Sequence, residues 1–249
     1  MPVAKKRIRP IVALKALSAL LRDPEDTKQV FLVTEALNGN AGMRSFERFK
    51  RSPVGQKVLG EKRDLLDRLC DQASLARLPR GTMGREYHEF MSSEGLTADG
   101  LVEASKAERT DDMSEDVRRF ADRGRDWHDL QHVLTGYGRD GLGEVCVLMF
   151  LCAQSWNPGL LLIVFAGMFK VASEIPDQPV KRAVWEAWRH GRKAAWLAGL
   201  DWEGLLTQPL DKIRPALEVG TPVVYRKILA DYRAKKAANT DEAPALAAE

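Results

Sequence analysis

The chain has little of several residues and patterns that would narrow its function. Its 249 residues include only four histidines and three cysteines, and the formal net charge is +3. That charge is too small to predict nucleic-acid binding. The cysteines, Cys70, Cys146 and Cys152, form no CxxC pattern, so we expect reduced, buried thiols in a reducing compartment.

The sequence also lacks the alternating pattern of β-strands, and β-branched residues are scarce. The most apolar stretch, residues 145–171, is interrupted at Gln154 and at Asn157 to Gly159. The pieces have roughly ten to twelve residues, whereas a membrane span needs about twenty. We therefore predict an all-α protein, one compact multi-helix domain, without a transmembrane helix. The apolar stretch is either a buried pair of core helices or part of an apolar groove or tunnel for a long apolar ligand.

Helical periodicity and capping signals divide the chain into three parts: a basic segment at 1–10, a helical domain at 11–236 and a disordered tail at 237–249. The start is typical of an amphipathic helix and not of a secretory signal or a mitochondrial presequence. A helix from Ser114 to Leu134 is expected to bend at Gly124. The other expected helices cover 11–21, 27–38, 43–50, 61–71, 84–92, 97–106, 144–154, 160–171, 180–200, 209–217 and 222–236.

Aromatic residues are concentrated near the C-terminus. Trp185, Trp188 and Trp196 are spaced at i, i+3 and i+11, which predicts one face of a helix. Core packing explains that face most simply, and anchoring at a lipid interface is the alternative. His88 and His190 have no partner at ligand spacing, so we interpret both as surface residues.

One run, RDWHDLQHVLTGYGRDGLGE, concentrates residues that bind metals. His128 and His132 are four residues apart, so both rings project from the same helix face, with Asp129 beside them. Glu144 follows a glycine-rich break that lets the chain fold back and bring a second carboxylate to the same point. Two histidines with carboxylates favour zinc, iron or manganese over calcium or magnesium.

Two interpretations of this run stay open. HxxxH spacing also occurs on helices whose histidines are hydrogen-bonded surface or core residues. If a metal is bound, Asp129 faces about 100° away from His128 on the helix. We therefore expect Asp129 to orient a histidine through its other ring nitrogen and not to bind the metal itself.

Arginines are concentrated just before this run, at Arg118, Arg119, Arg123 and Arg125. The simpler interpretation is a solvated helix face. The alternative is a positive rim, with Arg125 nearest the metal run, that attracts an anionic substrate group or acidic lipid headgroups.

The pattern H-D-x-x-H, eleven residues, then E resembles the metal signature of the coenzyme Q biosynthesis protein 4 family. The segment LPRGTMGREYHEFM, residues 78–91, resembles the family's P-x-G-[ST]-x-G-x-x-Y-x-x-F block. Residues 187–217 resemble its C-terminal block, with Trp202, Glu203, Pro209 and Arg214. The resemblance covers roughly residues 11 to 230, and none of the four ligand positions departs from it.

The resemblance implies action on polyprenylated 4-hydroxybenzoate-type intermediates of ubiquinone biosynthesis. The implied reaction is a metal-dependent oxidative decarboxylation of the ring, a lyase-type activity, with His128, Asp129, His132 and Glu144 as catalytic and metal-binding residues. The alternative is a non-enzymatic, lipid-binding scaffold that organises ubiquinone-biosynthesis enzymes at the membrane.

The same resemblance implies peripheral association with a membrane. This would be the inner membrane on its cytoplasmic side in a bacterium, or on the matrix side of the mitochondrion in a eukaryote. The expected partners are a polyprenylated quinone precursor, other ubiquinone-biosynthesis proteins and a second copy of the chain in a homodimer.

Overall fold

The computed structural model describes residues 8–23, 27–95 and 114–241. These residues form fifteen α-helices and one short 3-10 helix, and they contain no strand beyond an isolated bridge between Thr82 and Pro209. The prediction of an all-α protein is confirmed. The expected helix at 97–106 and part of the predicted tail lie outside the described residues.

Within each described range the helices follow one another with short connections. Their bounds are α1 Pro10–Arg22, α2 Thr27–Asn38, α3 Ala41–Arg51, α4 Pro53–Gly60, α5 Leu65–Cys70, α6 Gln72–Ala76, α7 Met83–Ser93, α9 Glu115–Asp126, α10 His128–Thr135, α11 Gly141–Gln154, α12 Pro158–Glu174, α13 Val180–Lys193, η1 Leu197–Gly199, α14 Trp202–Leu205, α15 Leu210–Ala216 and α16 Val223–Asp241.

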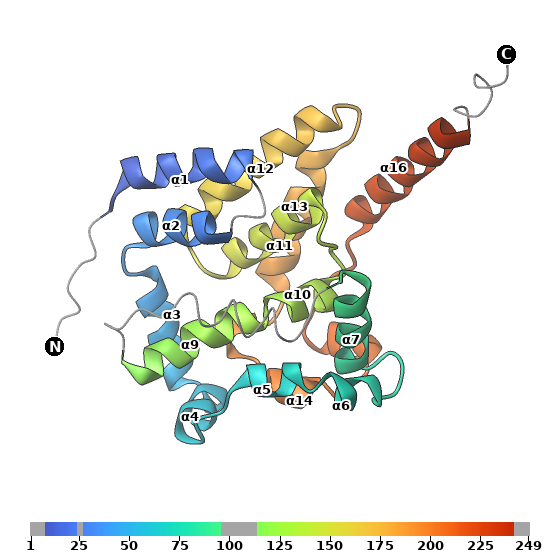
Figure 1. Ribbon diagram of the computed structural model, residues 1–249. Helices are drawn as coiled ribbons and strands as arrows, with labels where there is room; N and C mark the ends of the chain where they lie inside the picture. Colours follow the sequence, from blue (N-terminus) through green and yellow to red (C-terminus); the bar gives the residue numbers. More distant parts are fainter. Residues whose placement is uncertain (1–7, 24–26, 96–113, 242–249) are drawn as a thin grey trace, which may run out of the picture.

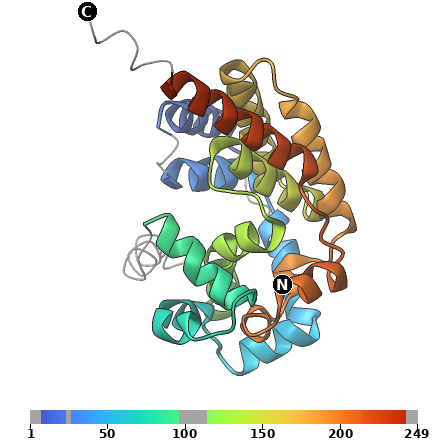
Figure 2. The same ribbon diagram turned by 90° about the vertical axis from the view of Figure 1, so that its right-hand side faces the viewer.

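The helices are arranged in two halves that meet at α10 (Figure 1). In one half, α11 and α13 pack on each other and on α12, which also carries α1 and α2. In the other half, α5, α6 and α14 lie below α9 and α10, and α7 lies beside α10 (Figure 1). In Figure 2, α16 passes in front of the first half, whereas in Figure 1 it projects away from it. Near its start, Tyr225 and Ile228 are buried in one apolar cluster with residues of α11 and α13.

The buried side chains form three apolar clusters, and α10 lies between the two largest. Its Leu130 and Leu134, both fully buried, belong to the cluster that joins α5, α7 and the segment 197–219. The next helix, α11, is buried in the cluster that joins α12, α13 and α16. The short connection between α10 and α11 therefore crosses from one apolar cluster to the other.

The long helix expected at 114–134 is two helices. It breaks at Trp127, whose ψ of 0° ends α9, and not at Gly124. Trp127 stacks on Trp202, with ring centroids 5.6 Å apart, so packing against the C-terminal segment determines where the break falls. As a result, α10 begins at the first histidine of the metal run.

The prediction that Trp185, Trp188 and Trp196 lie on one helix face is wrong for Trp196. Helix α13 ends at Lys193, so Trp196 lies outside it, where the Arg48 guanidinium covers its ring at 4.0 Å. Trp185 stacks on Trp188 but is 57% exposed, so it is not a core residue. The local spacing gave no sign of the extended backbone at Ala194 that ends the helix.

The apolar stretch at 145–171 divides as predicted, into α11 and α12. No helix in the described part of the chain combines the length and hydrophobicity needed to cross a membrane. Most of α11 is buried, whereas α12 leaves Phe165 and Phe169 exposed. An apolar groove or tunnel along these helices stays a prediction.

Candidate metal centre

The first turn and a half of α10 presents the two histidines and Asp129. One ligand atom from each of His128, Asp129 and His132 lies within 4.8 Å of the others. The two imidazole rings lie edge to face, with centroids 4.9 Å apart. The i, i+4 spacing therefore brings the rings together as the sequence predicted.

The glycine-rich break returns the chain and begins α11. Gly136 ends α10 with a φ of 78°, a conformation that glycine adopts without strain. Asp140 then caps α11, because its Oδ1 accepts hydrogen bonds from the amides of Leu142 and Gly143. Glu144 follows in the first turn of α11, where the helix dipole favours a carboxylate.

Glu144 reaches both histidines. Its Oε1 lies 3.4 Å from Nε2 of His132, and its Oε2 lies 3.8 Å from Nε2 of His128. Asp129 approaches His128 from the other ring nitrogen, with Oδ1 3.6 Å from Nδ1. The four predicted residues are thus brought together, and the two carboxylates face opposite nitrogens of His128.

His132 is the most constrained of the four residues. Its side chain is fully buried, and its ring stacks on Phe90 of α7 with centroids 5.8 Å apart. Its Nδ1 lies 3.1 Å from the carbonyl oxygen of Tyr137. Because a carbonyl only accepts, Nδ1 carries a proton and donates it to this carbonyl, and Nε2 is the ring nitrogen that faces Glu144.

No described group forms a hydrogen bond with that Nε2. A buried polar atom without a partner is uncommon in proteins, because its desolvation is uncompensated. This nitrogen lies among the Glu144 and His128 ligand atoms, which is where a bound cation would satisfy it. The donor set of two imidazoles and up to two carboxylates fits zinc, iron or manganese.

Charge coupling within the cluster shifts three pKa values. Burial lowers the pKa of His128, but the contact with Asp129 and the charge of Glu144 outweigh it and raise the pKa overall. Burial raises the pKa of Asp129 and of Glu144, but the neighbouring histidines outweigh it and lower both. The two carboxylates are therefore held in the ionised form that binds metals.

The C-terminal part of the chain supports α10 from outside. Nε of Arg214 donates to the carbonyl of Leu134 at 2.9 Å, and its Nη2 donates to that of Val133 at 3.0 Å. These carbonyls belong to the last turn of α10, which has no helical donors left for them. Arg214 therefore anchors the ligand-bearing helix to α15.

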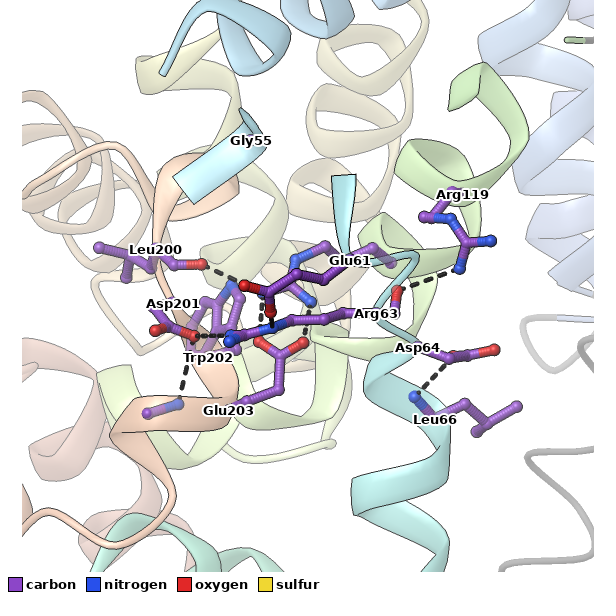
Figure 3. A network of polar contacts seen from close by, with 12 residues as sticks. Gly55, Glu61, Arg63, Asp64, Leu66, Arg119, Leu200, Asp201, Trp202 and Glu203 are labelled. Carbon is purple, nitrogen blue, oxygen red and sulfur yellow. Dashed lines mark hydrogen bonds and ion pairs between the residues drawn. The ribbon is translucent and has the colours of Figure 1, made fainter. Parts of the chain in front are cut away.

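Three of the four arginines in the cluster on α9, Arg119, Arg123 and Arg125, have internal partners. Arg123 is 3% exposed, and its Nη1 and Nη2 contact both carboxylate oxygens of Glu203 at 2.6 and 2.5 Å. Arg119 donates to the carbonyls of Lys62 and Arg63. Figure 3 shows Glu203 beside Arg63 in this network. Arg125 is paired with Asp122 and Asp126, and an anion rim at Arg125 stays a prediction.

Sequence reasoning overlooked several residues that hold the centre. Phe90 and Arg214 lie in blocks that carry the family resemblance, but nothing in their spacing predicted a contact with α10. The Asp140 cap had a local signal, an aspartate directly before the first residues of a helix. His88 and His190 are half-buried and not surface residues, and His88 Nδ1 lies 2.7 Å from Oε1 of Gln72.

Fold and site together define a class: an all-helical protein that presents two histidines and two carboxylates from two adjacent helices. The family model described as "Coenzyme Q (ubiquinone) biosynthesis protein Coq4" matches residues 3–222. The chain therefore belongs to the Coq4 family of ubiquinone biosynthesis proteins.

Relatives and a solved structure agree with this assignment. The chain is 27% identical over 215 residues to the mitochondrial ubiquinone biosynthesis protein COQ4 homolog of Danio rerio, covering 86% of this chain and 77% of that one. The human homolog is 27% identical over 184 residues, 74% of this chain and 68% of that one. A crystal structure from Nostoc punctiforme has the same fold, with a TM-score of 0.62 and 21% identity over 86% of this chain and all of the other.

Proposed function

We propose that this member of the Coq4 family is a metal-dependent enzyme. Its substrate would be a polyprenylated 4-hydroxybenzoate-type intermediate, and its reaction the oxidative decarboxylation of the ring. The observation that carries the proposal is Nε2 of His132, a buried nitrogen without a hydrogen-bond partner that faces Glu144 and lies beside His128.

Each of the four residues has a role in this proposal. His132 and His128 would bind the metal through Nε2, because both of these nitrogens face Glu144, which would supply a carboxylate oxygen. Asp129 contacts Nδ1 of His128, so it would hold the proton there and orient the ring. Two histidines and one carboxylate leave coordination positions open for a substrate or for dioxygen.

The reaction places demands on the site that these residues fit. Replacing a ring carboxylate by a hydroxyl releases carbon dioxide and removes two electrons. We propose dioxygen as the oxidant and water as a co-reactant, with hydrogen peroxide as the second product: ArCOOH + O2 + H2O → ArOH + CO2 + H2O2. A bound metal would supply Lewis acidity and a template for a phenolate or carboxylate oxygen. Phe90 on one side of His132 helps to exclude water from the ring, which strengthens electrostatic interactions in the site.

The experiment is metal content and turnover measured on one preparation. Wild type and His128→Ala are purified from the same host without chelator, and bound metals are determined by elemental analysis. Each is then incubated aerobically with a prenylated 4-hydroxybenzoate-type intermediate while loss of the ring carboxylate is followed. We expect metal and turnover in the wild type, and neither in a variant whose circular dichroism is unchanged. Wild type without metal would overturn the proposal.

A second candidate function is a lipid-binding organiser of ubiquinone-biosynthesis proteins at a membrane. It is favoured by the exposed apolar side chains Phe165, Phe169, Trp156 and Trp185, which are between 46% and 69% exposed. Exposed aromatic residues suit a membrane interface or a protein partner. Bound metal without turnover, together with co-sedimentation on lipid vesicles, would favour this role and a structural metal.

A further inference from the structure

The first turn of α16 is tied to the connection between α10 and α11. Tyr225 is 1% exposed, and its hydroxyl accepts a hydrogen bond from the amide of Gly138 at 2.8 Å. The same hydroxyl donates to Oδ2 of Asp140. Its ring lies edge to face with that of Tyr137, with centroids 5.2 Å apart. One side chain from the C-terminal helix thus contacts three residues of the connection.

Asp140 transmits this contact to α11. While Oδ2 binds the Tyr225 hydroxyl, Oδ1 caps α11 by accepting from Leu142 at 3.2 Å and from Gly143 at 3.1 Å. The backbone carbonyl of Asp140 accepts from the amide of Glu144 at 2.9 Å. The Asp140 carboxylate is therefore held by α16 through one oxygen and by α11 through the other. The backbone of Glu144 is hydrogen-bonded to the same residue.

The connection is packed too closely for a side chain at two of its glycines. A Cβ at Gly143 would lie 2.0 Å from the carbonyl oxygen of Gly138, and a Cβ at Gly138 would lie 2.7 Å from the Tyr225 hydroxyl. Such approaches are far inside van der Waals contact, so only glycine fits at both positions. The Tyr225 hydroxyl therefore lies in close contact with the backbone of the connection at Gly138.

The position of α11 relative to α10 determines the geometry of the candidate metal centre. Three of its four residues lie on α10, and their spacing is a property of that helix alone. Glu144 comes from α11, so its distances of 3.4 and 3.8 Å to the two histidines depend on how α11 is held relative to α10. Glu144 is also about one-third exposed, so packing around its side chain does not by itself hold it in place.

We propose that Tyr225 is a positioning residue for the metal centre: through Asp140 it sets the start of α11 and thereby the approach of Glu144 to His128 and His132. This inference rests on the proposed metal-binding function. It links the C-terminal helix, more than 80 residues away in the sequence, to the affinity of the site for its ion.

The first test is metal affinity in solution. Zn²⁺ is titrated into wild type, Tyr225→Phe and Tyr232→Phe by isothermal calorimetry, and Mn²⁺ is used in a second series. Loss of a residue that supports metal ligands typically weakens affinity by about 10- to 100-fold, and we expect at least about tenfold for Tyr225→Phe. Tyr232 is on the same helix and 52% exposed, so its change should leave affinity unaltered. Equal affinities for all three proteins would overturn the inference.

A double-mutant cycle separates positioning of Glu144 from a general loss of structure. If Tyr225 acts through Glu144, Tyr225→Phe weakens binding in the wild type but has no further effect on affinity in Glu144→Gln. Independent, additive losses in the two backgrounds would overturn the inference.

Hydrogen exchange gives a readout that needs no metal. In Tyr225→Phe the amides of Gly138, Leu142 and Gly143 should exchange faster, while amides in the middle of α13 keep wild-type rates. Unchanged exchange at these three amides would refute the positioning role even if the wild type bound no metal. Failure of the proposed metal site is recognised separately, by the absence of binding in the wild type.

Discussion

Two charged clusters on successive helices have opposite character. On α9, the buried Arg123 guanidinium is paired with Glu203 through both terminal nitrogens, and only its Nε lacks a partner. On α10, the buried His132 ring has one nitrogen bound to a carbonyl, while the other faces Glu144 without a hydrogen bond. The first cluster neutralises its own charge, whereas the second leaves a buried nitrogen without a hydrogen-bond partner.

The difference separates a structural cluster from a candidate binding site. A buried ion pair with complementary partners holds elements together, here α9 and α14, and has no ligand position to offer. A histidine oriented through one nitrogen with the other free is preorganised for a ligand at some expense of stability. We therefore expect changes in the α9 cluster to affect the free energy of unfolding most, and changes in the metal centre to affect it least.

The largest effect on stability is expected from Glu203→Ala. It leaves the buried Arg123 charge without its partner, and such a loss typically destabilises a protein by about 3–5 kcal/mol. The free energy of unfolding is measured by urea denaturation. Glu61→Ala is the control, since Glu61 pairs with Arg63 but is about half exposed, so we expect less than about 1 kcal/mol. Equal losses in the two variants would contradict the assignment of the α9 cluster as a structural element.

An intermediate effect is expected from Arg214→Met. The change keeps an unbranched apolar stem but removes the donors to the Val133 and Leu134 carbonyls. Hydrogen bonds from a charged donor contribute about 1.5–3 kcal/mol, so we expect a loss of that size in urea denaturation. Arg189→Met, at an exposed position of α13, is the matched control. If Arg214→Met unfolded with the free energy of the wild type, the contact of α10 with α15 through Arg214 would not stabilise the fold.

The ion pair between Arg123 and Glu203 should also make the free energy of unfolding depend on pH. Burial raises the pKa of Glu203, but the hydrogen bond and the charge of Arg123 outweigh it, so the pKa is lowered overall. A carboxyl with a lowered pKa in the folded state stabilises the protein at pH values above its unfolded pKa, which is about 4.3 for glutamate. That contribution disappears as the pH falls through the folded-state pKa.

Comparison with Glu203→Gln isolates this contribution. The difference in unfolding free energy between wild type and variant should shrink as the pH is lowered from about 5 toward about 3, by at most about 1.4 kcal/mol per pH unit for one proton. A difference that stays constant over this range would show that Glu203 titrates alike in the folded and unfolded states.

Local patterns in the sequence predicted the helical fold and the members of the site. The i, i+4 spacing of His128 and His132 determines their proximity once a helix forms, and the glycines before Glu144 indicated a return of the chain. Whether a segment is helical, and which candidate ligands lie on one helix face, depend on neighbours within a few residues, which a single sequence displays. These parts of the site could therefore be predicted from the amino-acid sequence alone.

Contacts between distant segments could not be predicted in the same way. Arg214 and Tyr225 lie about 80 residues or more from the groups they bind, and no periodicity links them to α10 or to Asp140. The partners of Arg123 and Arg125 were missed for the same reason, because a run of arginines looks identical whether it is solvated or paired. The break at Trp127 also depends on stacking with Trp202, a tertiary contact.

The smallest effect on stability is expected from Glu144→Gln in metal-free protein. The side chain is about one-third exposed and its contacts with the histidines are 3.4 and 3.8 Å long, so we expect a change below about 1 kcal/mol. With Zn²⁺ present the two proteins should separate, because a ligand at about 100 times its Kd stabilises the folded state by about 2.7 kcal/mol. Thermal denaturation with and without Zn²⁺ measures both effects. If Zn²⁺ raised the Tm of Glu144→Gln as much as that of the wild type, Glu144 would not be a ligand, and the contrast between the two clusters would then rest on the histidines and Asp129 alone.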